Sequence, residues 1–235
     1  MKLLFATRAD NNIKDMTDIT FPYIKDYAEK CGADFLAMSQ EPPIWTTEDP
    51  PRPHYRIMEL YNLFEEYDRI VSIDADTVIN KNCPNIFDEV PYDKVGIIYE
   101  DVGPSASHRR SMIKLAKEQF GDIDWETGYI NIGFSVFSKI HRDIFQPING
   151  EYFMEFGMAD VHLCYNIHKM GFQIHQLDHK WNHMTMFSQP WNNNADRFAS
   201  NIIHYAGEGV FDKPSVSNRV QQIKNDIQRI YGVNE

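Results

Sequence analysis

Hydrophobic positions along this chain follow two spacings that alternate from end to end. Short apolar runs, typical of buried β-strands, are separated by longer stretches in which apolar residues recur at helical spacing. Strands are predicted at residues 2–7, 35–38, 69–79, 95–99, 129–137, 173–177 and 202–205. Helices are predicted at residues 15–31, 55–67, 107–120, 141–145, 160–170 and 217–231. This alternation predicts an α/β fold with a mixed, mostly parallel sheet flanked by helices.

The elements fit one Rossmann-like domain over residues 1–215. Residues 216–235 carry an apolar stripe at helical spacing, and we expect them to form a C-terminal amphipathic helix packed on this domain. The segment 41–53 is rich in proline and acidic residues, which predicts a loop able to cover a site. Because α/β sheets bind ligands beyond the carboxyl ends of their strands, we expect the chemistry to lie there.

Composition narrows the class of protein. Of the 235 residues, 43% are hydrophobic and 13% aromatic, which is enough for a full core. The formal net charge of −11 argues against a partner that is nucleic acid or anionic lipid. Three cysteines without C-x-x-C spacing indicate reduced thiols and a cytoplasmic protein, and no apolar run in the sequence is long enough to span a membrane.

The stretch 69–79 is the strongest candidate for chemistry. An apolar run leads directly into Asp74 and Asp76, and side chains two positions apart on a strand point the same way. Two carboxylates at one point suit Mg²⁺ or Mn²⁺ held together with the phosphates of a substrate. The alternative is a strand that ends in a solvated turn. The buried run before the pair favours the metal site, because two unpaired buried carboxylates would repel each other.

Further segments of the chain carry a family resemblance when they are taken in order. They are Tyr55-Arg56-Ile57 ahead of Asp74-Ala75-Asp76, the strand 129–137 with its Asn131-Ile132-Gly133, the piece Lys180-Trp181-Asn182, and His204-Tyr205-Ala206-Gly207 followed by Lys213-Pro214. Together they resemble nucleotide-sugar-dependent glycosyltransferases of the GT-A fold, most closely the glycogenin and lipopolysaccharide galactosyltransferase-like group. The resemblance covers about residues 1–215.

The resemblance implies a donor site and a metal site. The metal, Mn²⁺ or Mg²⁺, would be held by Asp74, Asp76 and His204. The end of the first strand would approach the base of the nucleotide, Arg56 would face the donor sugar and phosphates, and Lys213 would close onto the diphosphate. The full set of implied donor-binding residues is Ala6, Thr7, Arg8, Arg56, Asp74, Ala75, Asp76, Gly133, Gly207 and Lys213.

Two residues are candidates for the sugar itself, Asn131 and Asp160. The resemblance places Asn131 against a sugar hydroxyl and Asp160 near the reacting carbon. The glycogenin-like group carries Asp-Gln-Asp where this chain has Met158-Ala159-Asp160, so only the last aspartate is carried over. The same segment also resembles the Glu-Asp motif of inverting GT-A enzymes, whose aspartate is a general base. The retaining or inverting outcome therefore stays open.

Each of these residues also has a purely structural interpretation. His204 could be a satisfied core histidine, Lys213 an exposed lysine, and Asp160 a helix cap. Arg56 could simply pair with a neighbouring acidic residue. Asn131 and Gly133 could mark a weakened strand or a bulge.

The sequence thus predicts a metal-dependent glycosyltransferase that moves a hexose from a nucleoside-diphosphate sugar, a UDP-hexose by resemblance, to a glycan or another hydroxyl acceptor. Three alternatives are weighed against it. A haloacid dehalogenase-type phosphatase would use Asp74 as its nucleophile, but that family places the motif on the first strand. A sugar-phosphate nucleotidyltransferase would need a glycine-rich basic loop near the N-terminus, which residues 8–12 lack. A non-catalytic nucleotide-sugar binding module would retain the same residues.

Overall fold

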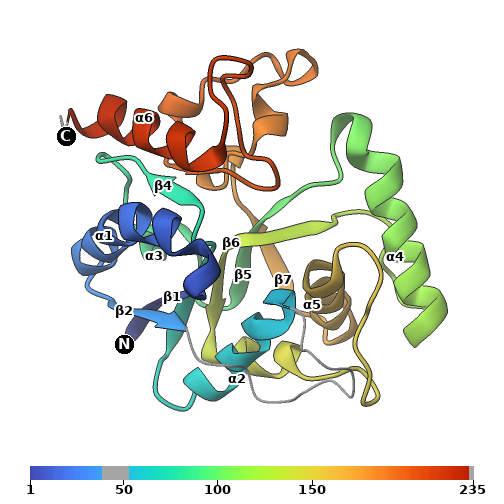
Figure 1. Ribbon diagram of the computed structural model, residues 1–235. Coiled ribbons are helices and arrows are strands. Elements are labelled where there is room, and N and C mark those ends of the chain that lie inside the picture. The colour runs from blue at the N-terminus through green and yellow to red at the C-terminus, as the bar shows by residue number, and fades with distance from the viewer. Residues whose placement is uncertain (39–52, 233–235) are drawn as a thin grey trace. The chain divides into compact units, whose positions relative to one another are not determined.

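The structure is a computed structural model that describes residues 1–38 and 53–232. It divides into two compact units, each assembled from separated stretches of chain (Figure 1). Unit 1 comprises Met1–Leu3, Gln40–Ser72 and Val90–Gln176. Unit 2 comprises Leu4–Ser39, Ile73–Glu89 and Leu177–Glu235.

Unit 1 contains a mixed sheet with helices packed on it. Its strands, in the order β3-β6-β5-β7, are β3 (Arg69–Ile73), β6 (Ile130–Ser138), β5 (Lys94–Tyr99) and β7 (Gln173–Gln176). Its α-helices are α2 (Leu60–Leu63), α4 (Ala106–Phe120) and α5 (Met158–Lys169). Its 3-10 helices are η2 (Pro53–Glu59), η3 (Gly103–Ser105) and η4 (Lys139–Phe145).

The central strand β5 of unit 1 runs antiparallel to β6 and parallel to β7. The β5–β6 register shifts between Ile97 and Ile98, where Ile97 faces Ser135 and Ile98 faces Asn131. The shift leaves β6 residues between Asn131 and Ser135 without a partner on β5, which is a β-bulge. Because bulges turn the strand locally, this one sets the direction of the segment that carries Asn131 and Gly133.

Unit 2 supplies a parallel strand pair, an antiparallel strand pair and three α-helices. Its strands are β1 (Leu3–Arg8), β2 (Asp34–Met38), β4 (Thr77–Ile79) and β8 (Ile202–His204). Its α-helices are α1 (Lys14–Lys30), α3 (Ile86–Glu89) and α6 (Arg219–Tyr231). Its 3-10 helices are η1 (Asn11–Ile13), η5 (His179–Trp181), η6 (Thr185–Ser188), η7 (Pro190–Asn192) and η8 (Arg197–Ala199).

Strand pairing in unit 2 joins parts of the chain that are distant in sequence. β1 and β2 pair in parallel, from Leu4 opposite Asp34 to Arg8 opposite Met38. β4 and β8 pair antiparallel, with Thr77 opposite His204. This second register brings the Asp74-Ala75-Asp76 segment to the end of the strand that carries His204.

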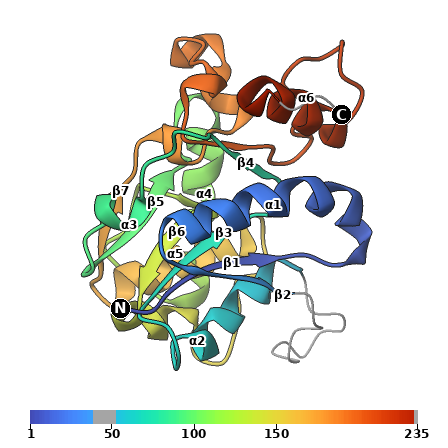
Figure 2. The ribbon, with the colours of Figure 1, turned by 90° about the vertical axis from the view of Figure 1, so that its left-hand side faces the viewer.

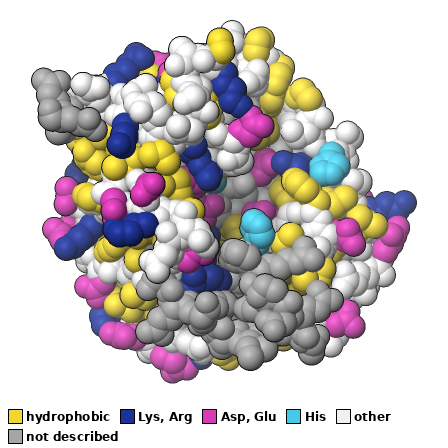
Figure 3. Space-filling model, viewed as in Figure 1, with side chains coloured by type: hydrophobic (Ala, Val, Ile, Leu, Met, Phe, Trp, Pro, Cys, Tyr) yellow, Lys and Arg dark blue, Asp and Glu magenta, His cyan; other side chains and the backbone are white. Residues whose placement is uncertain are grey.

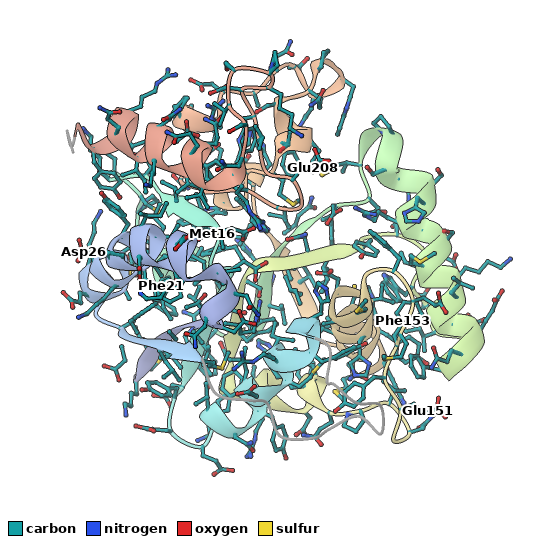
Figure 4. All side chains as sticks on the ribbon, viewed as in Figure 1. Met16, Phe21, Asp26, Glu151, Phe153 and Glu208 are labelled. Atoms are coloured by element: carbon teal, nitrogen blue, oxygen red, sulfur yellow. The ribbon has the colours of Figure 1, made fainter. Side chains whose placement is uncertain are left out.

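Helix α6 belongs to unit 2 and lies alongside α1 (Figures 1 and 2). Its inward residues Ile223, Ile227 and Ile230 form an apolar cluster with Met16 of α1, labelled in Figure 4, and with residues of the β4–β8 pair. Asn218 caps the helix by accepting a hydrogen bond from the Gln221 N–H at 2.9 Å. Apolar packing and a capped first turn therefore fix the start of α6 within unit 2.

The predicted α/β class and mixed, mostly parallel sheet are confirmed. The prediction of one helix over residues 55–67 differs from the structure. The chain there forms the 3-10 helix η2, followed by the short α-helix α2. Aromatic and β-branched residues such as Tyr55 and Ile57 lose side-chain freedom in an α-helix, and both are buried here. The predicted covering loop falls on 41–52, which lie outside the described residues, and on Pro53, the first residue of η2.

The three cysteines, Cys31, Cys83 and Cys164, are buried free thiols, as the sequence predicts. Among the described residues, no helix is both long enough and apolar enough to cross a membrane. Figure 3 shows acidic and basic side chains interspersed on the viewed face, rather than gathered by sign. On that face the excess of negative charge is therefore not concentrated in one patch.

Candidate metal centre and sugar site

Asp74 and Asp76 lie on a turn between two strands. β3 ends at Ile73 and β4 begins at Thr77, so the expectation that strand alternation aligns the two carboxylates is wrong. The turn is fixed by two hydroxyl groups instead. Thr77 donates to the Asp74 carbonyl at 2.9 Å, and Thr20 of α1 donates to the Ala75 carbonyl at 2.7 Å. Ala75 is thus buried between the two aspartates.

His204 joins the two carboxylates through the β4–β8 register. Its Nε2 atom lies 3.3 Å from Asp76 Oδ1 and 3.6 Å from Asp74 Oδ2. Ligand atoms of the three residues all lie within 4.8 Å of one another. Among the described residues, this is the single group of three or more such side chains gathered closely enough to share a metal ion.

The orientation of the His204 ring fits a metal ligand. Its Nδ1 lies 2.7 Å from the Asn182 side-chain oxygen, which can only accept, so Nδ1 carries a proton and donates. Nε2 then faces Asp74 and Asp76, where it is available to a metal ion in the neutral ring. A histidine that donates its far N–H to a fixed oxygen is the usual arrangement behind a metal-bound imidazole. Two carboxylates and one imidazole are a donor set that Mn²⁺ accepts.

Two arginines contact the outer sides of the carboxylates. Arg8 Nη2 donates to Asp74 Oδ1 at 2.5 Å, and Arg219 Nη1 donates to Asp76 Oδ2 at 2.7 Å. Burial raises the pKa of Asp76, but His204 and Arg219 outweigh it and hold that pKa below its usual value. The exposed fraction of the side chain is 34% for Asp74, 13% for Asp76 and 3% for His204, so a ligand can reach the cluster from the Asp74 side.

The other donor-site candidates of unit 2 lie on β1 and in the loop after β8. Ala6 and Thr7 are buried in β1, and Arg8 ends that strand against Asp74. Gly207 has φ +65°, with open space where a side chain would be. Lys213 forms an ion pair with Glu208, which lies in the same loop and is labelled in Figure 4.

The loop after β8 also borders a pocket of about 450 Å³ in unit 2. Its polar lining comes from Thr185, Gln189, Glu208 and Lys213, and its apolar lining includes Phe211. A pocket of this size with a few polar groups suits a small polar ligand such as a sugar. Thr185 lies in η6 and Gln189 directly follows it, so this side of the pocket is formed by the segment between β7 and β8.

In unit 1, Asn131 is part of a hydrogen-bonded group on β6. Its amide donates to Glu100 Oε2 at 2.8 Å, and its oxygen accepts from the Gly133 N–H at 3.0 Å. Arg109 of α4 holds the other Glu100 oxygen, with Nε at 2.7 Å. The bulge predicted as one interpretation of this segment is present, and it fixes Asn131 beside a buried carboxylate.

Asp160 lies in the first turn of α5 and contacts the same strand. Its Oδ1 accepts from the Ile132 N–H at 2.8 Å, which ties the start of the helix to the bulge of β6. Burial raises the pKa of Tyr129, and the neighbouring Asp160 and Glu100 carboxylates raise it further. Unit 1 therefore gathers Asn131, Glu100 and Asp160 around one segment of β6.

Arg56 lies in η2 of unit 1, with only 8% of the residue exposed. Its Nε is 3.5 Å from Glu59 Oε1, the pairing that the structural interpretation anticipates. This contact is long and weak, because 3.5 Å lies beyond the usual range for an N–H···O hydrogen bond. This weak pair alone does not account for the position of the buried Arg56 side chain.

Sequence reasoning missed three residues that the structure brings into these groups. Asn182 orients His204, Arg219 contacts Asp76, and Glu100 binds Asn131. Asn182 stands in the Lys-Trp-Asn piece, so its position carried a signal but its role did not. Arg219 looked like any charged residue of an amphipathic helix, and Glu100 like a polar residue after a strand.

Comparison with known proteins gives structural matches only. No protein-family model and no curated protein sequence matches this chain. The WbbM bifunctional glycosyltransferase is similar with TM-score 0.62 and 14% identity over 98% of this chain and 50% of its own. The galactosyltransferase LgtC, solved with donor and acceptor sugar analogues, is similar with TM-score 0.59 and 13% identity over 100% of this chain and 98% of its own.

A third match is the glycosyltransferase involved in glycosylation of the major capsid of PBCV-1, with TM-score 0.57 and 13% identity over 96% of this chain and 98% of its own. All three solved structures are glycosyltransferases. This is the GT-A fold. The chain spans half the length of WbbM but nearly all of LgtC, so the GT-A fold accounts for the whole of it. Identities this low establish the fold and leave the residue roles to the geometry described above.

Proposed function

We propose that this protein is a divalent-cation-dependent glycosyltransferase that transfers a hexose from a nucleoside-diphosphate sugar, a UDP-hexose by resemblance, to the hydroxyl group of an acceptor. The observation that carries the proposal is the Asp74–Asp76–His204 cluster in a chain with the GT-A fold. Three free thiols agree with the expectation of a cytoplasmic protein.

The cluster is the proposed site for the cation and the diphosphate. When bound there, Mn²⁺ or Mg²⁺ would neutralise negative charge on the diphosphate as it becomes the leaving group. The chain contributes the donors: carboxylate oxygens of Asp74 and Asp76, and the Nε2 lone pair of His204 that Asn182 directs. The end of β1 at Arg8, next to Asp74, is the proposed neighbour of the nucleotide.

The sugar is proposed to bind the group on β6 in unit 1. Asn131 would hydrogen-bond a sugar hydroxyl, with its amide kept in place by Glu100, and Gly133 would allow close approach of the backbone. Asp160 would either stabilise positive charge on the anomeric carbon or accept the proton of the incoming hydroxyl. Arg56 completes this proposed set. NMR of the product anomer would decide between retention and inversion.

The loop after β8 is proposed to close the donor site. Lys213 would exchange its Glu208 partner for the diphosphate, and Gly207 supplies the left-handed turn that the loop requires. The pocket bordered by Thr185, Gln189 and Lys213 is the proposed entry for the acceptor.

Two alternatives predict different behaviour. A haloacid dehalogenase-type phosphatase would need Asp74 as a nucleophile at the end of the first strand, whereas Asp74 follows β3 and its Oδ1 is engaged by Arg8. Covalent phosphorylation of Asp74 would be its signature. A binding module without catalysis would bind the nucleotide sugar but never hydrolyse it.

The test is calorimetric titration of UDP-, GDP- and CMP-sugars with and without Mn²⁺, combined with an assay for slow donor hydrolysis. We expect binding that requires Mn²⁺ and is lost in Asp76→Ala, because that change removes a metal ligand. Asp18→Ala serves as the matched control, since Asp18 is an exposed aspartate of α1 in the same unit. Nucleotide binding that does not depend on Mn²⁺, or cleavage of phosphomonoesters, would refute the proposal.

A further inference from the structure

The two carboxylate oxygens of Asp76 face different partners. Oδ1 lies 3.3 Å from His204 Nε2 and belongs to the metal cluster, whereas Oδ2 accepts a hydrogen bond from Arg219 at 2.7 Å. A cation can therefore use Oδ1 without displacing the arginine. Arg219 therefore contacts the Asp76 carboxylate on the oxygen that does not face His204.

Arg219 uses only one of its nitrogens for these contacts. Nη1 donates both to Asp76 Oδ2 and to the Tyr205 carbonyl, the latter at 3.2 Å. Within residues 1–38 and 53–232, these are the only hydrogen bonds of the Arg219 side chain. Nε and Nη2 thus keep their N–H groups for another acceptor, and the side chain is 32% exposed.

Helix α6 sets the backbone position of Arg219, because Arg219 is its first residue. A buried polar network anchors the helix further along. Asp226 of α6 accepts from the Tyr205 hydroxyl at 2.6 Å and from Arg197 Nε at 2.8 Å. The same Tyr205 whose carbonyl meets Arg219 is therefore bonded to α6 through its hydroxyl. The backbone of Arg219 therefore belongs to a helix that buried hydrogen bonds anchor.

We propose that Arg219 is a donor-binding residue: Nη1 stays on Asp76 Oδ2 and leaves Oδ1 to a cation, while Nε and Nη2 bind phosphate oxygens of the nucleoside diphosphate. This inference rests on the proposed function and adds α6 to its donor site. The planar guanidinium suits both tasks, because its N–H groups form a fixed fork that matches carboxylate and phosphate oxygens.

The assignment predicts opposite effects on metal and nucleotide. Arg219 carries a positive charge next to the metal ligands, so Arg219→Gln removes repulsion, and Mn²⁺ alone should bind at least as tightly as to the wild type. The same variant loses charge-assisted hydrogen bonds to phosphate. At saturating Mn²⁺ its Kd for UDP should therefore rise about 10–100-fold.

The experiment is isothermal titration of the full chain, first with Mn²⁺ alone and then with UDP at saturating Mn²⁺. The variants are Arg219→Gln, Arg219→Lys and Lys224→Gln. Lys224 is exposed on the same helix and controls for the loss of one positive charge. Arg219→Lys keeps the charge without the fork and should recover part of the UDP affinity. Circular dichroism of each variant reports whether α6 is retained.

The outcomes separate this inference from the proposed function. Weaker UDP binding in Arg219→Gln, with undiminished Mn²⁺ binding and wild-type behaviour of Lys224→Gln, supports the assignment. Equal losses of Mn²⁺ and UDP affinity would reduce Arg219 to a support for Asp76, and unchanged UDP affinity would also overturn the assignment. Failure of the wild-type protein to bind UDP in Mn²⁺ would instead contradict the proposed function.

Discussion

At the scale of single residues, the decisive contact of the candidate metal centre is the hydrogen bond from His204 Nδ1 to Asn182 Oδ1. A buried histidine beside two carboxylates could equally be a protonated partner in an ion network. The Asn182 oxygen fixes which nitrogen carries the proton in the neutral ring, and it leaves Nε2 as a ligand. The side chain behind the cluster thus determines what the cluster can bind.

Substitution of Asn182 should change the affinity for the cation. Asn182→Leu removes the acceptor at nearly constant volume, and we expect Mn²⁺ affinity to fall about 10–100-fold. Asn182→Asp retains an acceptor and adds a negative charge, so its affinity should equal or exceed that of the wild type. The free Mn²⁺ signal in electron paramagnetic resonance measures both. If Asn182→Leu retained the fold and bound Mn²⁺ with wild-type affinity, Asn182 would have no role in metal binding.

At the scale of elements, the start of α5 decides where Asp160 lies. Gly157 precedes the helix with φ +86°, and a Cβ at this position would collide with the Tyr129 hydroxyl and come within 2.9 Å of Val161 Cγ2. The glycine therefore serves two needs, a left-handed backbone and a close approach to Tyr129, the residue before β6. Without it, the first turn of α5 could not bring Asp160 to the Ile132 N–H.

Substitutions at two glycines of unit 1 distinguish the energetic cost of a left-handed backbone from the cost of a steric collision. Gly157→Ala incurs both the left-handed penalty and a collision, so we expect a loss of about 2–5 kcal/mol in unfolding free energy. Gly171→Ala, at φ +73° with no atom within 4 Å of its Cβ, should cost only about 1–2 kcal/mol. Urea denaturation measures the difference. Equal losses of unfolding free energy in the two variants would mean that Tyr129 moves aside at no measurable cost in stability.

At the scale of the whole molecule, buried neutral histidines link stability to pH. Burial lowers the pKa of His162 and of His141 to about 4. In the core of unit 1, His162 Nε2 contacts the Gln146 carbonyl at 2.9 Å, and Nδ1 has no hydrogen-bond partner among the described residues. Protonation would leave a buried N–H group without an acceptor, so the folded protein resists it.

Stability should therefore decrease as the solution becomes acidic. Above the ordinary histidine pKa of about 6.5 both states are neutral, and below it the unfolded chain gains protons that the folded protein refuses until about pH 4. Replacing His162 with methionine should reduce the loss of unfolding free energy between pH 7 and pH 5.5 by about 1 kcal/mol.

Urea denaturation at the two pH values measures this effect. His54→Gln, at an exposed position of η2, is the control and should keep the wild-type dependence on pH. An unchanged pH dependence in His162→Met would show that His162 does not contribute to it.

The sequence by itself determined the order of the elements and the chemistry at their ends. Apolar runs and helical spacings are local properties, and they predicted the strands and most of the helices close to where the structure has them. They also placed Asp74 and Asp76 directly after a buried apolar run and His204 at the end of another, although the predicted strand 69–79 is divided by the turn that carries the aspartates. The helix 55–67 was wrong in type over residues 55–59, because helical spacing of apolar residues does not distinguish a 3-10 helix from an α-helix.

Only the tertiary structure decided how these ends meet. Strand register placed Thr77 opposite His204, a turn rather than strand alternation converged the aspartates, and α6 brought Arg219 to Asp76 across 143 positions of sequence. Such contacts depend on packing between distant segments, and no periodicity within a segment encodes them. For the same reason Asn182 and Glu100, which orient His204 and Asn131, carried no local signal of their role.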